Sequence, residues 1–161
     1  MMEIRPFRPE DRAAVWEILQ PMLCAGETYA LPQEMSEAEA IAYWTGQDRE
    51  TFVAEEGGQV LGTYYLRANQ LGGGSHVANC GYVTSPTATG RGIARSMCAH
   101  SLALAKERGF RAMQFNFVVS TNTRAVSLWE SLGFEIVGRL PNGFLSPQQG
   151  YVDALVMFRE L

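Results

Sequence analysis

The sequence predicts an α/β fold in which a mixed sheet of about seven strands carries about four helices on its two faces. Stretches with alternating apolar residues and stretches with apolar residues three or four apart succeed one another along the chain. Their order is strand, two helices, three strands, helix, strand, helix and two strands, which is typical of helices packed on both faces of a sheet. The 161 residues, of which 47% are hydrophobic, favour a single globular domain spanning residues 1–161.

The N-terminal part is expected to hold one strand and two helices. A short strand covers residues 2–7, and an amphipathic helix follows it to about Pro21. Ser36 with Glu39 three residues later forms a capping box, which predicts a second helix ending near Trp44.

Three strands joined by glycine turns are expected next. They cover residues 51–55, 59–68 and 76–84. The pair Gly57-Gly58 indicates a hairpin between the first two, and the glycines at 72–74 mark a flexible turn before the third.

A helix is expected from Ile93 to Arg108, because its apolar residues share one stripe and Gly109 ends it. A strand over residues 112–119 follows. Its alternation is expected to place three side chains on one face, namely Gln114, Asn116 and Val118.

The last helix begins at Asn122 and ends at Gly133, which should bring Phe134 against Trp129. Two final strands are expected over residues 134–139 and 151–159. The stretch between them is long for a hairpin, and long loops are often functional, so it is expected either to line the substrate pocket or to make a dimer contact.

Composition excludes several classes of protein. The net charge of −4 argues against nonspecific nucleic-acid binding. The cysteines are odd in number and lack metal-binding spacing, so they indicate buried thiols in a reducing compartment and no metal site. The charged N-terminus and the lack of a long apolar run predict a cytoplasmic protein without a signal peptide or a membrane segment.

The chain is organised around residues 81–95. Here a strand ends, a turn that contains Pro86, Gly90 and Gly92 follows, and a new helix begins. Unpaired N–H groups in a first helical turn, together with the helix dipole, form an anion site. Arg91 and Arg95 lie four residues apart and are expected to share one face. Positive side chains at a helix N-terminus are unfavourable unless a polyphosphate is bound. The alternative is a glycine turn that merely caps a helix.

Two stretches carry a family resemblance. Residues 83–94, Val-Thr-Ser-Pro-Thr-Ala-Thr-Gly-Arg-Gly-Ile-Ala, resemble the acetyl-CoA pyrophosphate loop of the GNAT superfamily of N-acyltransferases. Residues 122–134 resemble that superfamily's later helix, and both stretches have the usual order and separation. The resemblance implies a mostly antiparallel sheet, splayed in the middle between the strand ending at Thr84 and the strand containing Asn116. Acetyl-CoA would lie in this gap, and the amine would enter from the other side.

The resemblance also assigns cofactor residues. Backbone groups of Tyr82, Val83 and Thr84 would pair with the pantetheine arm as an added strand does, and one N–H would polarise the thioester carbonyl. Asn122 would bond the pantetheine amides, and its alternative is a plain N-cap. The pyrophosphate would be held by the turn and the first helical residues, namely Thr89, Gly90, Arg91, Gly92, Ile93, Ala94 and Arg95.

The expected chemistry is direct attack of a neutral amine on the thioester within a ternary complex. The family's usual thiolate protonator is a tyrosine, but the chain has Trp129 there, and indole cannot act as the acid. The family's frequent glutamate base is also missing, so either a water relay or an acceptor amine of modest pKa is expected, with Glu27 as the one nearby carboxylate. A covalent route through Cys80 or Cys98 is the alternative, without a sequence cue for a lowered thiol pKa.

Two asparagines are candidates for catalysis and substrate binding. Asn79 and Asn116 lie in strands that border the expected gap, and an amide is disfavoured in a strand unless its hydrogen bonds are used. Residues 115–122 and 26–29, including Tyr29, are similar to the GNAT branch that acetylates proline analogues such as azetidine-2-carboxylate, in which asparagines bind the substrate. This implies a small amino or imino acid as the acceptor. The alternative is a structural bond to a neighbouring loop.

Other functions stay open at this stage. One is acetylation of protein N-termini or lysines, and another is an acyl-CoA-binding sensor without turnover, because the tyrosine and the glutamate are missing. The resemblance also implies a homodimer.

Overall fold

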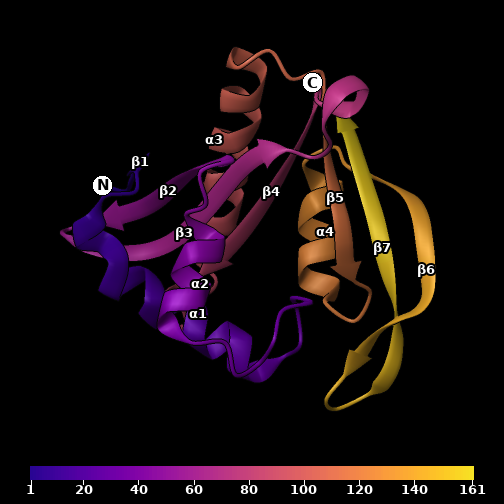
Figure 1. Ribbon diagram of the computed structural model, residues 1–161, viewed down its shortest axis with the longest axis horizontal. Helices are drawn as coiled ribbons and strands as arrows, with labels where there is room; N and C mark the ends of the chain where they lie inside the picture. Colours follow the sequence, from indigo (N-terminus) through magenta and orange to yellow (C-terminus); the bar gives the residue numbers. More distant parts are fainter.

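The computed structural model describes residues 1–161 and contains one sheet of seven strands (Figure 1). The strands are β1 (Glu3–Pro6), β2 (Arg49–Glu56), β3 (Gln59–Ala68), β4 (Val77–Thr84), β5 (Ala112–Val119), β6 (Glu135–Ser146) and β7 (Gly150–Glu160). They lie in the order β1-β2-β3-β4-β5-β7-β6, and every neighbouring pair is antiparallel except β4 with β5. The predicted mixed, mostly antiparallel sheet is therefore confirmed.

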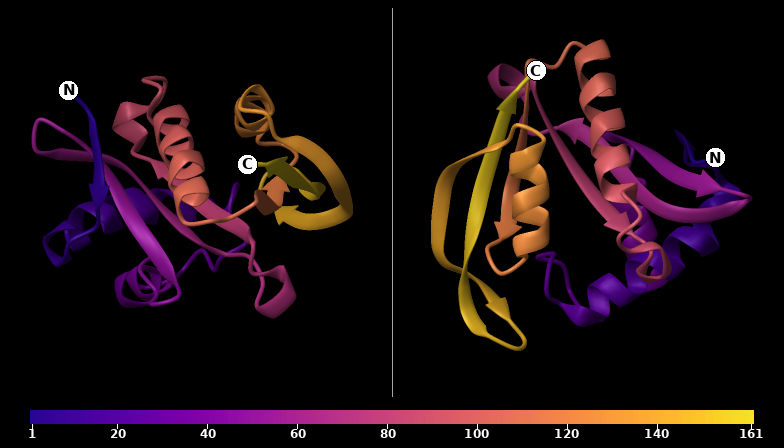
Figure 2. Two further views of the ribbon diagram at one scale, coloured as in Figure 1. Left: turned by 90° about the horizontal axis from the view of Figure 1, so that it is seen from above. Right: turned by 180° about the vertical axis from the view of Figure 1, so that it is seen from behind.

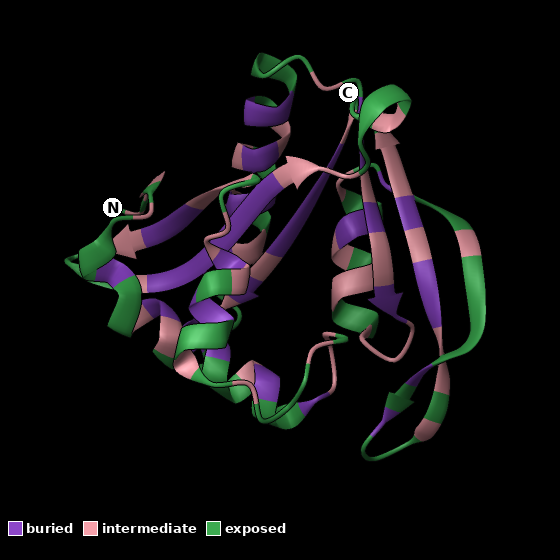
Figure 3. Cartoon of the chain, in the orientation of Figure 1, coloured by how far each residue is buried: buried purple, intermediate pink, exposed green.

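Four α-helices cover the two faces of this sheet (Figure 2). They are α1 (Arg12–Ala25), α2 (Glu37–Trp44), α3 (Ile93–Glu107) and α4 (Thr123–Ser131). Strand alternation divides the apolar side chains into two cores. Val53 and Tyr65 pack with α1 and α2, whereas their neighbours Phe52 and Tyr64 pack on the side of α3 and α4. Buried positions accordingly run along the middle strands (Figure 3).

The sheet is splayed between β4 and β5. These strands pair only at Val77 with Ala112 and at Ala78 with Met113. At the next position the side chain of Asn79 spans the widening gap, because its Nδ2 donates to the carbonyl oxygen of Gln114 at 2.9 Å. The gap opens from this point toward the carboxyl end of β4, as Figure 1 shows.

The predicted helix boundaries that depend on a local capping motif are confirmed. Ser36 and Glu39 form the capping box at the start of α2. At the end of α4, the N–H of Gly133 donates to Glu130 and the N–H of Phe134 donates to Trp129. This pair of bonds is the Schellman arrangement, and it brings the Phe134 and Trp129 rings to 6.4 Å between centroids.

The first helix does not end at Pro21, as the sequence suggested, but continues to Ala25 and is capped by Gly26. Pro21 lacks only the N–H that would bond the carbonyl of Glu17, and both residues are exposed, so water can reach that carbonyl. The extra turn buries Leu23 in the core beside α2, which stabilises the continuation.

The expected loop over residues 140–150 is mostly strand. β6 runs on to Ser146, and only residues 147–149 separate it from β7. The register shifts between Leu140 and Phe144, so the segment Pro141-Asn142-Gly143 bulges out of the ladder without ending it. Phe144 then returns to a buried position and lies 6.1 Å from the Phe117 ring.

The expected alternation along β5 is also broken by a bulge. Phe115 pairs with Met157 and Val118 pairs with Leu155, so two residues of β5 oppose one residue of β7. Val118 therefore joins the core that contains Phe115, rather than sharing a face with Asn116.

Candidate functional site

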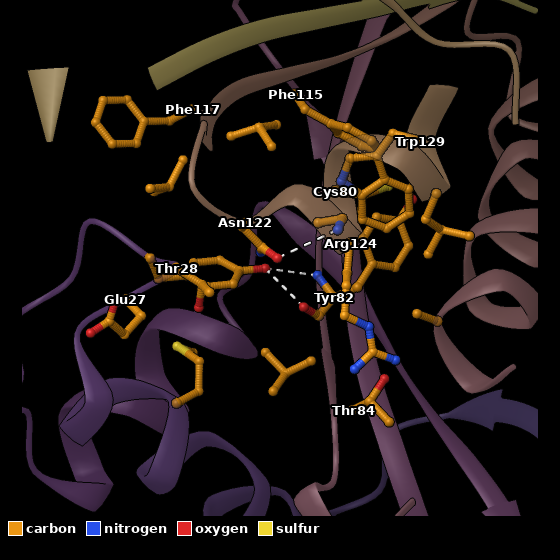
Figure 4. Close-up of a pocket in the computed structure, with 18 of the residues that line it drawn as sticks. Glu27, Thr28, Cys80, Tyr82, Thr84, Phe115, Phe117, Asn122, Arg124 and Trp129 are labelled. Carbon is orange, nitrogen blue, oxygen red and sulfur yellow. Dashed lines mark hydrogen bonds between the residues drawn. The ribbon is translucent and has the colours of Figure 1, made fainter. Parts of the chain in front are cut away.

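A cavity of about 800 Å³ lies at the splay between β4 and β5. Its walls come from the segment after α1, the end of β3, β4, the start of α3, β5 and α4 (Figure 4). Every site residue predicted from the sequence lines it except Arg91. These are Glu27, Tyr29, Asn79, Tyr82, Val83, Thr84, Thr89, Gly90, Gly92, Ile93, Ala94, Arg95, Asn116 and Asn122.

The start of α3 presents a row of free backbone donors. No N–H between Thr89 and Arg95 donates to another group of the chain, and the first bond into the helix comes from Ser96 to Gly92. Gly90 and Gly92 have φ angles of 82° and 77°, which favour glycine, and a Cβ on either would meet no atom within 4 Å. The row is therefore unobstructed, and such a row at a helix N-terminus binds phosphate groups.

The two arginines of this turn point in different directions, contrary to the expectation that they share one face. Arg91 precedes the left-handed Gly92, so the helical spacing does not apply to it, and its guanidinium pairs with Glu56 on β2. Arg95 lies inside the helix, donates to the Ser131 hydroxyl at 2.9 Å and lines the cavity. Arg95 is thus the cation of the turn that faces the cavity.

Along β4, the backbone N–H and carbonyl groups of every second residue face the gap. The N–H of Ser85 and the carbonyl of Val77 bond on the β3 side, so the backbone groups of odd-numbered residues, Val83 included, face β3. The backbone groups of Tyr82 and Thr84 consequently face the gap.

The hydroxyl of Tyr29 forms hydrogen bonds with both backbone groups of Tyr82 that face the gap. It accepts from the Tyr82 N–H at 2.8 Å and donates to the Tyr82 carbonyl at 3.1 Å (dashed lines in Figure 4). Burial raises the pKa of Tyr29, so this hydroxyl keeps its proton and can donate. Gly81 permits the approach, because a Cβ there would lie 3.0 Å from the Tyr29 oxygen. Tyr29 therefore ties the segment after α1 to the edge of β4.

Asn122 caps α4 and also lines the cavity. Its side-chain oxygen accepts from the N–H of Ala125 at 3.4 Å, which confirms the predicted N-cap. Its Nδ2 donates to no group of the chain, so the cap leaves one amide donor for a ligand.

An aromatic wall bounds the cavity on the side of α4. The Trp129 ring lies 5.1 Å from Tyr82 and 5.0 Å from Phe115 between centroids. Cys80 is a buried residue of the cavity lining, and burial raises the pKa of its thiol to about 12. Neither group supplies acid or nucleophile at neutral pH, since indole does not ionise and a protonated thiol is a poor nucleophile.

The opposite side of the cavity is lined by amides that are already paired. Asn79 accepts from Arg67 Nε at 3.2 Å and donates across the gap to Gln114. Asn116 accepts from the Gln114 amide at 2.9 Å and donates to Asn69 at 2.6 Å. Both asparagines thus make the structural bonds that the sequence left open as their alternative role, while still lining the cavity.

Glu27 is the one carboxylate among the residues that line the cavity. Its Oε2 accepts from the Ser146 hydroxyl at 3.4 Å, which links the segment after α1 to the end of β6. The residues that the sequence placed in a long loop therefore reach this rim through Ser146 but do not line the cavity themselves.

Several lining residues were not predicted from the sequence. Arg67, Tyr65 and Tyr43 line the side that holds Asn79, and Arg124 lies on α4. Arg67 is the penultimate residue of β3 and lies opposite Asn79 in the β3–β4 ladder, a register that strand pairing sets and the local sequence does not. The tyrosines carry no local pattern that separates a cavity wall from a core position.

No helix in the structure combines the length and the apolar character needed to cross a membrane.

Comparisons with known proteins agree on one family. A model of the acetyltransferase (GNAT) family matches residues 13–134. The N-acetyltransferase aca1 of Schizosaccharomyces pombe is 37% identical over 98 residues, which cover 60% of this chain and 47% of that protein. The match thus spans about half the length of this relative.

Solved structures resemble the chain over nearly its whole length. A GCN5-related N-acetyltransferase from Kribbella flavida is 39% identical with a TM-score of 0.95, covering 99% of this chain and 98% of that chain. A GNAT phosphinothricin acetyltransferase from Sinorhizobium meliloti, solved in complex with AcCoA, is 24% identical with a TM-score of 0.86, covering 99% and 88%. At that identity the second likeness shows the fold alone.

Proposed function

Because the chain belongs to the acetyltransferase (GNAT) family of enzymes, we propose that it transfers an acetyl group from acetyl-CoA to the amine of a small amino or imino acid. The observation that carries the proposal is the row of unpaired N–H groups from Thr89 to Arg95 at the cavity between β4 and β5. A diphosphate matches this row in charge and in hydrogen-bonding capacity.

The free groups along the gap fit the rest of the cofactor. The backbone of Tyr82 and Thr84 can pair with the amides of a pantetheine arm, as an added strand would. The free Nδ2 of Asn122 can donate to a carbonyl of the same arm. Arg95 and Arg124 add positive charge at the α3–α4 side of the cavity, where phosphates would lie.

Acetyl-CoA supplies a reactive thioester whose thiolate is a good leaving group, so strong acid catalysis is not required. The chain's own contribution is then to hold the two reactants together, exclude water with the aromatic wall and accept a proton from the amine. The raised thiol pKa of Cys80 supports direct attack by the amine instead of an acetyl-cysteine intermediate. Glu27 is the carboxylate available as the base, either directly or through water.

The test is thiol release from acetyl-CoA with a panel of amines that includes amino acids, imino acids, peptide N-termini and lysine peptides. We expect release with the small acceptors. Transfer only to peptides would move the proposal to protein acetylation. Binding of acetyl-CoA without release for any amine would overturn the transferase proposal in favour of a sensor.

A pair of arginine variants on α3 tests the cofactor site itself. Arg95→Gln removes a cation that faces the cavity, and Arg108→Gln removes one at the far end of the same helix, where Arg108 pairs with Glu50. We expect the Kd for acetyl-CoA to rise roughly 5- to 10-fold in the first variant and to stay unchanged in the second. Equal effects in both variants would contradict this placement of the diphosphate.

A homodimer belongs to the same proposal. Exposed large apolar side chains gather on the β6–β7 hairpin, which forms one edge of the sheet, and they are Ile136, Val137, Leu140, Leu145 and Tyr151. An apolar sheet edge of this kind favours pairing with a second copy. Sedimentation velocity of the wild type and of Val137→Lys tests it, and a wild type that stays monomeric at high concentration would end this part of the proposal.

A further inference from the structure

The amide-lined side of the cavity holds a single cation, Arg67, at the end of β3. The other arginines that line the cavity, Arg95 and Arg124, lie on α3 and α4. Arg67 stands opposite Asn79 in the β3–β4 ladder, one residue past the last β4–β5 pair, so it sits where the gap closes.

The guanidinium of Arg67 is held in place, and its one ion pair within the chain is long and open to solvent. Its Nε donates to Asn79 Oδ1 at 3.2 Å, which fixes the direction of the side chain. Its Nη1 lies 3.9 Å from Asp48 Oδ2, too far for a hydrogen bond, and that carboxylate side chain is 62% exposed. Its Nη2 donates to no group of the chain. Two guanidinium nitrogens therefore remain for a ligand, and their fork geometry suits a carboxylate.

The neighbouring amides cannot do this as well. The two polar atoms of Asn79 are used by Arg67 and Gln114, and those of Asn116 are used by Gln114 and Asn69. Each Nδ2 keeps only a second N–H, and a neutral amide can offer a carboxylate that one bond without charge, whereas Arg67 offers a positive charge and two nitrogens. Asn79 is then a positioning residue that orients the guanidinium.

Resting on the proposed function, we infer that Arg67 binds the carboxylate of the acceptor and thereby selects amino or imino acids over amines without an acidic group. The charges of the cavity support the assignment, because Glu27 is the only lining carboxylate and would attract the positive end of a zwitterion. The Tyr65 ring, with Arg67 Cζ at 5.8 Å from its centroid, adds an apolar wall for the body of a small acceptor.

The test compares acceptors that differ only in the acid group. Initial rates are measured with L-proline, L-azetidine-2-carboxylate and L-alanine, and with the carboxamide of each, at saturating acetyl-CoA. The wild type should show a kcat/KM for the best acid roughly 10- to 100-fold above that of its carboxamide, because a hydrogen bond to a charged group contributes that much discrimination. The difference should lie mainly in KM.

Variants separate recognition from folding. Arg67→Gln should lose the preference for the acid, so that its kcat/KM falls far more for the acid than for the carboxamide, and Arg67→Lys should retain part of the preference. Arg108→Gln, which lies outside the cavity, should keep the wild-type preference. Thermal unfolding of each variant checks that it folds.

Two outcomes would overturn the inference while leaving the transferase standing. One is an equal kcat/KM for acids and carboxamides in the wild type. The other is a folded Arg67→Gln variant whose kcat/KM falls by the same factor for the acid and for its carboxamide. Absence of turnover on every amine would instead remove the proposed function, and the inference with it.

Discussion

Replacing Tyr29 by Phe tests how the gap-facing edge of β4 is used. In the structure the Tyr29 hydroxyl makes two hydrogen bonds to the backbone of Tyr82. The proposed function assigns the same N–H and carbonyl to the pantetheine arm, so the hydroxyl and the cofactor compete for them. The phenylalanine ring keeps the packing of Tyr29 on Trp44, whose centroid lies 6.0 Å away, and removes only the competitor.

The magnitude follows from the two bonds that are lost. A hydrogen bond contributes about 1 kcal/mol net, and water that enters the cavity replaces part of both, so the ligand-free variant should lose about 1 kcal/mol of stability. For a chain of this size the loss corresponds to a Tm lower by about 2–4 °C. The wild type must break the same bonds when the cofactor binds, so the variant should bind acetyl-CoA about fivefold more tightly.

Calorimetric titration gives the Kd, and thermal unfolding with and without saturating acetyl-CoA gives the stability of each state. The two proteins should differ in Tm without the cofactor and converge with it. Tyr43→Phe is the matched control, because it also removes a hydroxyl from the cavity wall but leaves Tyr82 untouched. Weaker cofactor binding by Tyr29→Phe would refute the reasoning, since the hydroxyl would then be a partner of the cofactor and not its competitor.

Two further predictions concern a thiol and a carboxyl group. Cys80→Ala should keep most of the wild-type kcat, because the thiol stays protonated, whereas a covalent role would show as a loss of roughly 10³-fold or more. The hydrogen bonds from Arg5 hold the pKa of Asp11 below its usual range, so in the folded state this carboxyl favours its ionised form. The stability that the ionised Asp11 contributes is therefore present above the pKa of the unfolded state, which lies near 4. It is lost as pH falls through the lower pKa of the folded state. Asp11→Asn should reduce stability by about 2 kcal/mol at pH 7 and flatten the decline between pH 5 and pH 2 in denaturant melts, and an unchanged slope would contradict the assignment.

The features that depend on a few adjacent residues were predictable. The glycine turn with its free N–H groups, the capping box at Ser36 and the Schellman end of α4 all follow from backbone geometry that the local residues impose. The same holds for the N-cap at Asn122. Local chemistry and the family resemblance therefore located all but one of the predicted site residues on the cavity wall.

The errors share a different cause. The predicted end of the first helix at Pro21 was wrong because burial of Leu23 favours a further turn, and the predicted alternation along β5 was wrong because the register with β7 introduces a bulge. The direction of Arg91 depends on Glu56, which lies 35 residues earlier in the chain. In each case the deciding contact is with a residue distant in the chain, which the neighbouring sequence does not identify.

The sequence by itself determined the family, the order of helices and strands, and the glycine turn at the start of α3, because turn residues and hydrophobic periodicity act over a few positions. Only the tertiary structure decided that the Tyr29 hydroxyl meets the Tyr82 backbone, that Asn79 bridges the splayed strands and that Arg67 keeps free donors beside it. These contacts join residues that are distant in the chain, and they exist because strand pairing and core packing bring those residues together.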